Sequence, residues 1–241
     1  MTDSLPVLRV AWLGPVPYEH ALEIQRGMLD QRKRGEILDT LLLLEHPHVY
    51  TLGRRAVREH VLASPDVLQA LGAKVVETDR GGEVTYHGPG QLVGYPIMSI
   101  REAGLGPVSY VRILEQTVID TLRLYGVSGH RVVGKTGVWV GGEPGAKPPH
   151  GQNPAGQKVS AIGVRVSAGV AMHGFALNVS TDLAYFSHIV PCGMPHLETA
   201  SIASLTGASP ATREVATQVA RHLAGHLQRQ LRWTASDSLA A

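Results

Sequence analysis

The 241-residue sequence has little cysteine, few aromatic residues and almost no net charge. One cysteine cannot form an intramolecular disulfide, and it excludes a zinc or iron–sulfur site built from several thiolates. Aromatic residues make up 5% of the chain, which leaves few platforms on which single-stranded nucleic acid can stack. A formal charge of +2 gives no argument for nucleic acid either. We therefore expect neither a nucleic-acid partner nor a bound metal.

Long hydrophobic runs are also missing. No stretch reaches the roughly 18 consecutive apolar residues of a membrane helix, and the N-terminus has no cationic start followed by an apolar run. The single cysteine suits a reducing compartment. We expect a cytoplasmic protein that has no membrane partner. A hydrophobic content of 44% and a charged content of 17% are typical of a globular domain with a sizeable core.

Apolar runs of strand length are interleaved irregularly with segments of helical periodicity. The patterns predict strands over 8–13, 40–44, 74–78, 92–100, 131–133, 137–140, 158–166 and 169–179. They predict helices that begin near Pro17, Ser64, Pro107 and Ser209, and short helical turns over 182–186 and 199–205. The run 40–44 indicates a strand buried on both faces, 158–166 and 169–179 form an antiparallel pair, and Pro96 favours an edge strand or a bulge.

These elements indicate an α/β fold of the α+β type: a single domain with a mixed, largely antiparallel sheet flanked by helices. We expect the domain to span residues 1–233. The Gly- and Pro-rich segment 141–157 has no apolar periodicity and is predicted to be a surface loop. The small, polar residues 234–241 are predicted to be a disordered tail.

The stretch RGGEVTYHGPGQ, residues 80–91, combines four glycines with charged, aromatic and imidazole side chains. This mixture favours a loop over a regular strand. Glycine brings the backbone close to a partner, so a pocket lined by main-chain N–H groups is one interpretation. An ordinary hairpin turn is the other. Arg80 and Tyr86 are candidates to bind or position a substrate, and their alternative role is to anchor the loop.

Cys192 stands between Pro191 and Gly193, in a loop followed by a predicted short helix. A thiolate near a cation is an effective nucleophile, although a free cysteine is also a common small core residue. Lys158 follows the flexible segment and precedes an apolar strand, so it is a candidate general base and acid. A solvated edge charge is its alternative interpretation. Sequence spacing alone does not establish contact between the two.

Histidines supply alternative bases and one weak metal candidate. His87 lies among the glycines and His173 lies on a predicted strand, where either could pair with Cys192. His46 and His48 would share a face of an extended chain, but no clear third ligand accompanies them. The residues by themselves thus predict a thiol acyl-transfer or hydrolase site beside a glycine-lined pocket.

The stretch 80–91 closely resembles the octanoyltransferases that load octanoyl groups onto lipoyl domains, often called lipoate-protein ligase B enzymes. Between about residues 8 and 205 the resemblance continues in family order through VYTLGRR (49–55), GKTGVW (134–139), GQKVSAIGVR (156–165), HGFALNVSTD (173–182) and FSHIVPCG (186–193). It implies a fold similar to the catalytic domain of biotin and lipoate ligases. The segment 141–157 looks longer than is typical of the family, and we expect it to bear on partner docking.

The resemblance also implies the chemistry. Cys192 would take the octanoyl group from octanoyl acyl carrier protein as a thioester, and the target lysine of a lipoyl domain would attack it. Lys158 matches the lysine that keeps the thiol ionised and shuttles its proton. The implied acceptors are the lipoyl domains of 2-oxoacid dehydrogenase E2 subunits and the glycine cleavage H protein, with no cofactor. The matching substrate-binding residues are Arg80, Gly81, Gly82, Glu83, Val84, Thr85, Tyr86, His87, Ala161, Ile162, Gly163, Gly174, Phe175 and Ala176, with His173 in support.

Backbone amides near Cys192 or in 161–163 are candidates to hold the developing oxyanion. Two other functions remain open at this point. An ATP-dependent lipoate or biotin-type protein ligase of the same fold would work through an acyl-adenylate and would not need Cys192. A noncatalytic protein that holds an acyl or lipoyl group would form no covalent intermediate.

Overall fold

The computed structural model describes residues 5–142, 156–195 and 197–235, and in this part of the chain eight strands form the main sheet. Their order is β11 (Gln230–Trp233), β1 (Val7–Pro15), β2 (Thr40–Glu45), β6 (Gln91–Ser99), β10 (Val170–Asn178), β9 (Gln157–Ser167), β8 (Lys135–Val140) and β7 (Gly129–Val132). β1 runs parallel to β2 and β11, whereas the other neighbours are antiparallel. The predicted mixed, largely antiparallel sheet is confirmed.

A second sheet has the strand order β4 (Lys74–Glu77), β3 (Val49–Leu52) and β5 (Val84–His87). Its third strand corrects the prediction of a continuous loop over 80–91. Val84, Thr85 and Tyr86 are good strand formers, and β5 pairs antiparallel with β3. The glycines are therefore confined to the two ends of this strand, at 81–82 and 88–90.

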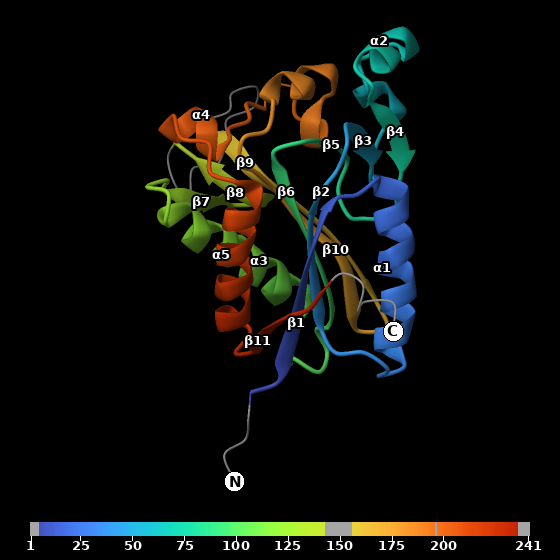
Figure 1. Cartoon of the computed structure of the whole chain (residues 1–241). Helices are drawn as coiled ribbons and strands as arrows, with labels where there is room; N and C mark the ends of the chain where they lie inside the picture. The colour runs from blue at the N-terminus through green and yellow to red at the C-terminus, as the bar shows by residue number, and fades with distance from the viewer. Residues whose placement is uncertain (1–4, 143–155, 196, 236–241) are drawn as a thin grey trace.

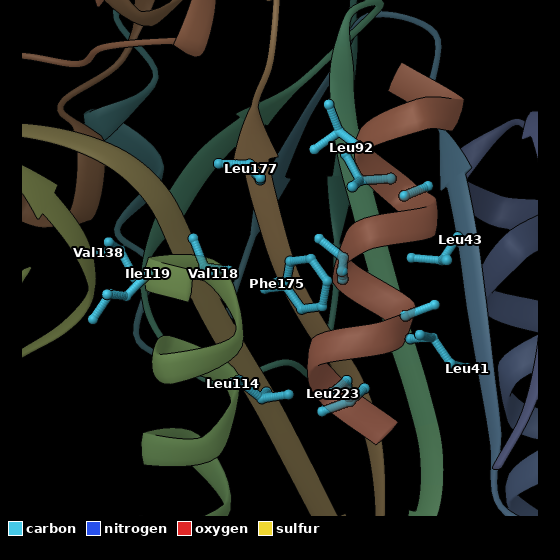
Figure 2. Packing of buried hydrophobic residues seen from close by; sticks show 14 of the residues in the cluster. Leu41, Leu43, Leu92, Leu114, Val118, Ile119, Val138, Phe175, Leu177 and Leu223 are labelled. Carbon is cyan, nitrogen blue, oxygen red and sulfur yellow. The ribbon is translucent and has the colours of Figure 1, made fainter. Parts of the chain in front are cut away.

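Helices cover both faces of the main sheet. In Figure 1, α1 (Tyr18–Lys33) lies on one side, and α3 (Pro107–Arg123) and α5 (Thr212–His226) lie together on the other. The strand β2 shows how the sheet serves both layers. Leu41 and Leu43 pack in the cluster with α3 and α5, as Figure 2 shows, whereas Leu42 and Leu44 pack against α1. The expectation that 40–44 is buried on both faces is confirmed.

Local chemistry sets the ends of the helices. Proline is the first residue of α3 and of the short α2 (Pro65–Ala70), and the Ser64 hydroxyl accepts a hydrogen bond from the Val67 amide. Gly35 and Gly126 follow α1 and α3 in left-handed conformations that stop a helix without a Cβ clash. The remaining α-helix of the described chain is α4 (Ile202–Thr206).

The strand β6 departs from its prediction at Pro96. It is neither an edge strand nor bulged, because it lies between β2 and β10 and keeps one register along β10. The pairing with β10 lapses between Met98 and Gly94, opposite His173. His173 has a φ of +57°, and its amide donates to the side-chain oxygen of Gln25 at 2.9 Å. A side chain of α1 thus replaces a sheet partner where proline interrupts the ladder.

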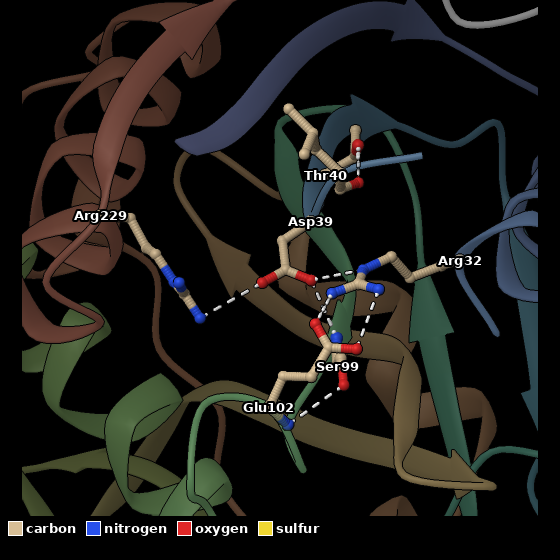
Figure 3. A network of polar contacts seen from close by, with 7 residues as sticks. Arg32, Asp39, Thr40, Ser99, Glu102 and Arg229 are labelled. Carbon is tan, nitrogen blue, oxygen red and sulfur yellow. Dashed lines mark hydrogen bonds and ion pairs between the residues drawn. The ribbon is translucent and has the colours of Figure 1, made fainter. Parts of the chain in front are cut away.

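A buried carboxylate joins three parts of the fold (Figure 3). Asp39 precedes β2 and accepts from the Arg32 Nε at 2.8 Å and from the Ser99 amide at 2.9 Å. Arg229, just before β11, lies 3.5 Å from its second oxygen. Glu102 binds the outer side of Arg32. Asp39 therefore ties the end of α1 and the connection after α5 to the end of β6.

The strand β11 was not predicted from the sequence. The predicted surface loop 141–157 and the predicted tail 234–241 lie largely outside the described residues, because 143–155 and 236–241 are not described. The domain limits stay a prediction. Among the described residues, no helix combines the length and apolar character that crossing a bilayer requires.

Candidate active site

Cys192 lies on a tight 3₁₀ turn, η3 (Pro191–Gly193), with a φ of +55° and a ψ of +26°. A non-glycine residue seldom adopts this left-handed conformation, and such residues gather at functional sites. The turn is closed by hydrogen bonds from the Gly193 amide to the Val190 carbonyl and from the Met194 amide to the Pro191 carbonyl. These two amides are therefore already used and are not spare donors for an oxyanion.

Lys158, near the start of β9, meets this thiol. Its Nζ donates to the Cys192 Sγ at 3.3 Å and lies 5.3 Å from the centre of the Trp139 ring. The lysine is buried, with 7% of its surface exposed, so the alternative interpretation of Lys158 as a solvated charge at a sheet edge is wrong. Its main chain donates to Glu198 and accepts from Ala200. The segment after Cys192 is thereby fastened to the strand that carries Lys158.

A cleft of about 500 Å³ opens beside Cys192 and Lys158. It brings together all but one of the predicted substrate-binding residues. Two tyrosines that were not predicted, Tyr18 and Tyr95, complete its wall. The predicted residues that line it are Arg80, Gly81, Gly82, Glu83, Val84, Thr85, His87, Ala161, Ile162, Gly163, His173, Gly174, Phe175 and Ala176, together with Cys192 and Lys158.

Tyr86 is the predicted residue that the cleft does not include. It is fully buried among Tyr50, Phe186 and Ile189, and its hydroxyl lies 2.7 Å from the Nδ1 of His48. The strand β5 explains the difference, because an extended chain cannot turn every side chain toward one face. In this structure Tyr86 supports the cleft from behind.

Glycine at 81 and 163 serves chain packing as well as the cleft. The Gly81 amide donates to the Val164 carbonyl at 3.1 Å. A Cβ on Gly163 would lie 2.6 Å from the Gly81 carbonyl oxygen. Two backbones approach each other here more closely than side chains permit. The residues 161–163 also pair with 174–176 of β10 in the sheet ladder.

Arg80 places a buried positive charge in the wall of the cleft. Its guanidinium donates to the hydroxyl and carbonyl oxygens of Thr51 and to the Gly81 carbonyl. Among the described residues it forms no ion pair with a carboxylate. Burial lowers the pKa of Arg80 from its usual value. A buried cation that lacks a counter-ion favours an anion in the cleft, such as a thiolate or an oxyanion.

The two candidate bases have other partners. The Nε2 of His173 lies 2.7 Å from Asp79, which also binds Arg165. The Nδ1 of His87 lies 2.7 Å from the Gln91 side-chain oxygen. Burial lowers the pKa of His173 to about 4 and that of His87 well below its usual value, so both are neutral near pH 7. Lys158, and neither histidine, contacts the thiol.

His46 and His48 do not form the metal pair considered above. The chain between β2 and β3 is not extended, so the two rings face different partners. His46 lies 2.8 Å from the Tyr95 hydroxyl, and its other nitrogen lies 2.6 Å from a main-chain oxygen. His48 stacks on Tyr185, with ring centres 4.2 Å apart. Tyr95 was missed because an apolar strand gives no sign that its hydroxyl reaches a cleft.

A second cavity of about 300 Å³ also borders Cys192. It shares five residues with the cleft, Thr85, Lys158, Ala161, Ala176 and Cys192. Its other lining residues are Gln91, Ser160, Asn178, Phe186, Pro191, Leu197 and Thr199. Cys192 and Lys158 therefore border both cavities.

The chain has the lipoyl protein ligase A/B catalytic domain, because the model of that family matches residues 17–224. Two relatives identify the branch. The octanoyltransferase of Solibacter usitatus is 49% identical over 88% of this chain and 89% of its own length. That of Chloroflexus aurantiacus (strain J-10-fl) is 51% identical over 87% and 89%. The chain belongs to the octanoyltransferase family.

Solved structures agree with the fold. Lipoate-protein ligase A bound with ATP superposes with a TM-score of 0.74 at 17% identity, covering 97% of this chain and 92% of that protein. A bipartite lipoate protein ligase from Thermoplasma acidophilum, studied with its E2 lipoyl domain, gives 0.71 at 18% identity, covering 98% and 91%. Identities this low support a common fold. The predicted likeness to the lipoate ligase catalytic domain is confirmed.

Proposed function

We propose that this octanoyltransferase carries its acyl group on Cys192, with Lys158 as the proton carrier. The observation that supports the proposal is the 3.3 Å contact between Lys158 Nζ and Cys192 Sγ at the junction of two cavities. The donor is octanoyl acyl carrier protein. The acceptors are lipoyl domains, in 2-oxoacid dehydrogenase E2 subunits and the glycine cleavage H protein.

The first half-reaction exchanges one thioester for another. Lys158 holds the thiol proton while the Cys192 sulfur attacks the octanoyl carbonyl, and the bond to the carrier's thiol breaks. The departing thiolate takes the proton from Lys158. The two thioesters are close in energy, so this step needs no ATP. Arg80 adds a fixed positive charge to the cleft wall while negative charge develops on the oxygen.

The second half-reaction forms an amide. The amine of the acceptor lysine attacks the Cys192 thioester, and the carbon–sulfur bond breaks. Lys158 receives the proton that the attacking amine loses and returns one to the sulfur. An amide is lower in energy than a thioester, which drives the transfer. The acyl chain lies in the cleft between Phe175, Ile162 and the tyrosines, where each buried methylene contributes about 0.8 kcal/mol.

The test is to incubate the protein with octanoyl acyl carrier protein in the absence of ATP and to weigh the intact chain. We expect a gain of one octanoyl group that neutral hydroxylamine removes, and no gain in Cys192→Ala. Lys158→Gln keeps a polar side chain but cannot exchange the proton, so its acylation should slow by roughly 100-fold or more.

Two outcomes would overturn the proposal. One is an unmodified wild-type chain that labels a lipoyl domain only when free octanoate and ATP are supplied, as an adenylate-forming ligase would. The other is full transfer activity in Cys192→Ala. Circular dichroism of each variant checks that the fold is retained, so that a loss of labelling can be assigned to the side chain.

A further inference from the structure

A cluster of metal-ligating side chains lies away from Cys192, on the helical layer. α3 and α5 lie side by side in Figure 1 and share one core cluster. His222 and His226 are four residues apart on α5, so they lie on one face of the helix. Asp120, from α3, faces them. None of the three lines either cavity beside the thiol.

The geometry is close to that of a coordination shell. One ligand atom from each residue can be chosen so that all three lie within 4.8 Å of one another. Ligands bound tetrahedrally to zinc at 2.0–2.2 Å lie about 3.4 Å apart, so small side-chain rotations close the shell. His226 Nε2 already lies 2.8 Å from Asp120 Oδ2. An ion placed there would take the position of the proton in that hydrogen bond.

The surroundings hold Asp120 in place. Its second oxygen accepts from Arg123 at 2.6 Å and from Gln116 at 3.0 Å, which fixes the carboxylate as outer-shell partners do in metal sites. Arg123 also opposes a cation, but its side chain is 66% exposed and can turn into solvent.

There is also room for an ion and its water. The three ligands border an open hollow of about 670 Å³, whose other walls are Arg123, Leu124 and Gly225. We propose that Asp120, His222 and His226 form a binding site for a divalent transition metal that fastens α5 to α3. Two imidazoles and one carboxylate suit Zn²⁺, with water in the fourth position, whereas Ca²⁺ and Mg²⁺ prefer all-oxygen shells.

The test titrates Zn²⁺ into the full chain without a histidine tag, in competition with a chromophoric chelator. Cys192→Ser is the background, because a free thiol also binds zinc. We expect one ion per chain. His222→Gln and His226→Gln should each raise the dissociation constant by tenfold or more, and Asp120→Asn should weaken binding as well. His20→Gln, on α1, is the matched control and should leave binding unchanged.

A second readout is spectroscopic. Co²⁺ in place of Zn²⁺ should give visible absorption bands of a tetrahedral site, and these bands should vanish in His226→Gln. The metal-free melting temperature of each variant verifies that it is folded. The proposal fails if the chain binds no Zn²⁺ saturably, or if the histidine variants bind it as tightly as their parent. Neither result bears on acyl transfer by Cys192.

Discussion

Cys192 is followed by a glycine in a left-handed conformation. Gly193 has a φ of +66°, and a Cβ there would collide with the Glu83 carboxylate. We expect Gly193→Ala to lose about 1 kcal/mol of stability through its backbone conformation. It should also lose on the order of 10- to 100-fold in acylation rate, because the nucleophile is displaced. The rate of octanoyl transfer to the chain, followed by mass, measures the effect.

Gly207 provides the control for that substitution. It has a φ of +73°, at the end of α4, with nothing within 4 Å of an added Cβ. Gly207→Ala should therefore lose similar stability and keep the wild-type rate. Equal rates in the two variants would contradict a positioning effect at Gly193 and leave only backbone strain.

Single residues show how far sequence reasoning reaches. The Pro–Cys–Gly sequence and the position of a lysine after a Gly- and Pro-rich segment marked Cys192 and Lys158 as candidates. The two residues are 34 positions apart in the sequence, and a local sequence pattern cannot predict a contact between residues that far apart. Thr51 illustrates the same limit, because its role appears only when β3 and β5 bring it against Arg80. Individual side chains were recognisable, whereas their partners came from the tertiary fold.

At the scale of elements, the buried contacts of Asp39 hold α1, β6 and the segment before β11 together, so a substitution at Asp39 should lower stability. Asp39→Asn leaves Arg32 and Arg229 buried without the charge they share, with 10% and 11% of their side chains exposed. We expect a loss of about 3 kcal/mol in the free energy of unfolding. Urea unfolding followed by circular dichroism measures it. Glu102→Gln removes the exposed partner of Arg32 and should lose less than about 1 kcal/mol. Similar losses in both variants would count against the buried pair.

Elements with strong periodicity were predictable, and elements defined by their neighbours were not. α1, α3 and α5 follow apolar stripes with proline or glycine at their ends. β11 has four residues, Gln230–Trp233, with largely exposed side chains, so it exists as a strand because β1 offers an edge. Pro96 was assigned to an edge or a bulge on general grounds. The structure instead keeps it inside the sheet, where the amide of His173 on β10, opposite Pro96, donates to the Gln25 side chain in place of a β6 partner.

At the scale of the whole molecule, buried histidines set the response to acid. Burial lowers the pKa of His46 and of His173 to about 4 in the folded chain, against 6.5 when exposed. Below about pH 6.5 the unfolded chain takes up protons that the folded chain does not. Stability is therefore full above pH 6.5 and falls as the pH drops toward 4. The slope approaches about 1.4 kcal/mol per pH unit for each histidine.

Urea unfolding at pH 7.5, 6.0 and 5.0 tests this expectation. His46→Asn should lower stability overall and give a shallower decline below pH 6, because one titrating group is gone. A free energy of unfolding that is constant or rises between pH 7.5 and 5.0 would show that these rings are protonated in the folded state.

The pairing of β1 with β11 also determines the order in which the two edges of β1 can be paired during folding. Val7 aligns with Gln230, so the first strand of the sheet receives its outer neighbour from the far end of the chain. During synthesis β1 can pair with β2 early, but its other edge stays open until residue 230 has been made. Closing so long a loop is slow, and an open strand edge invites pairing with another chain. When β11 pairs with β1, it covers this open edge and prevents unfinished copies from pairing through it.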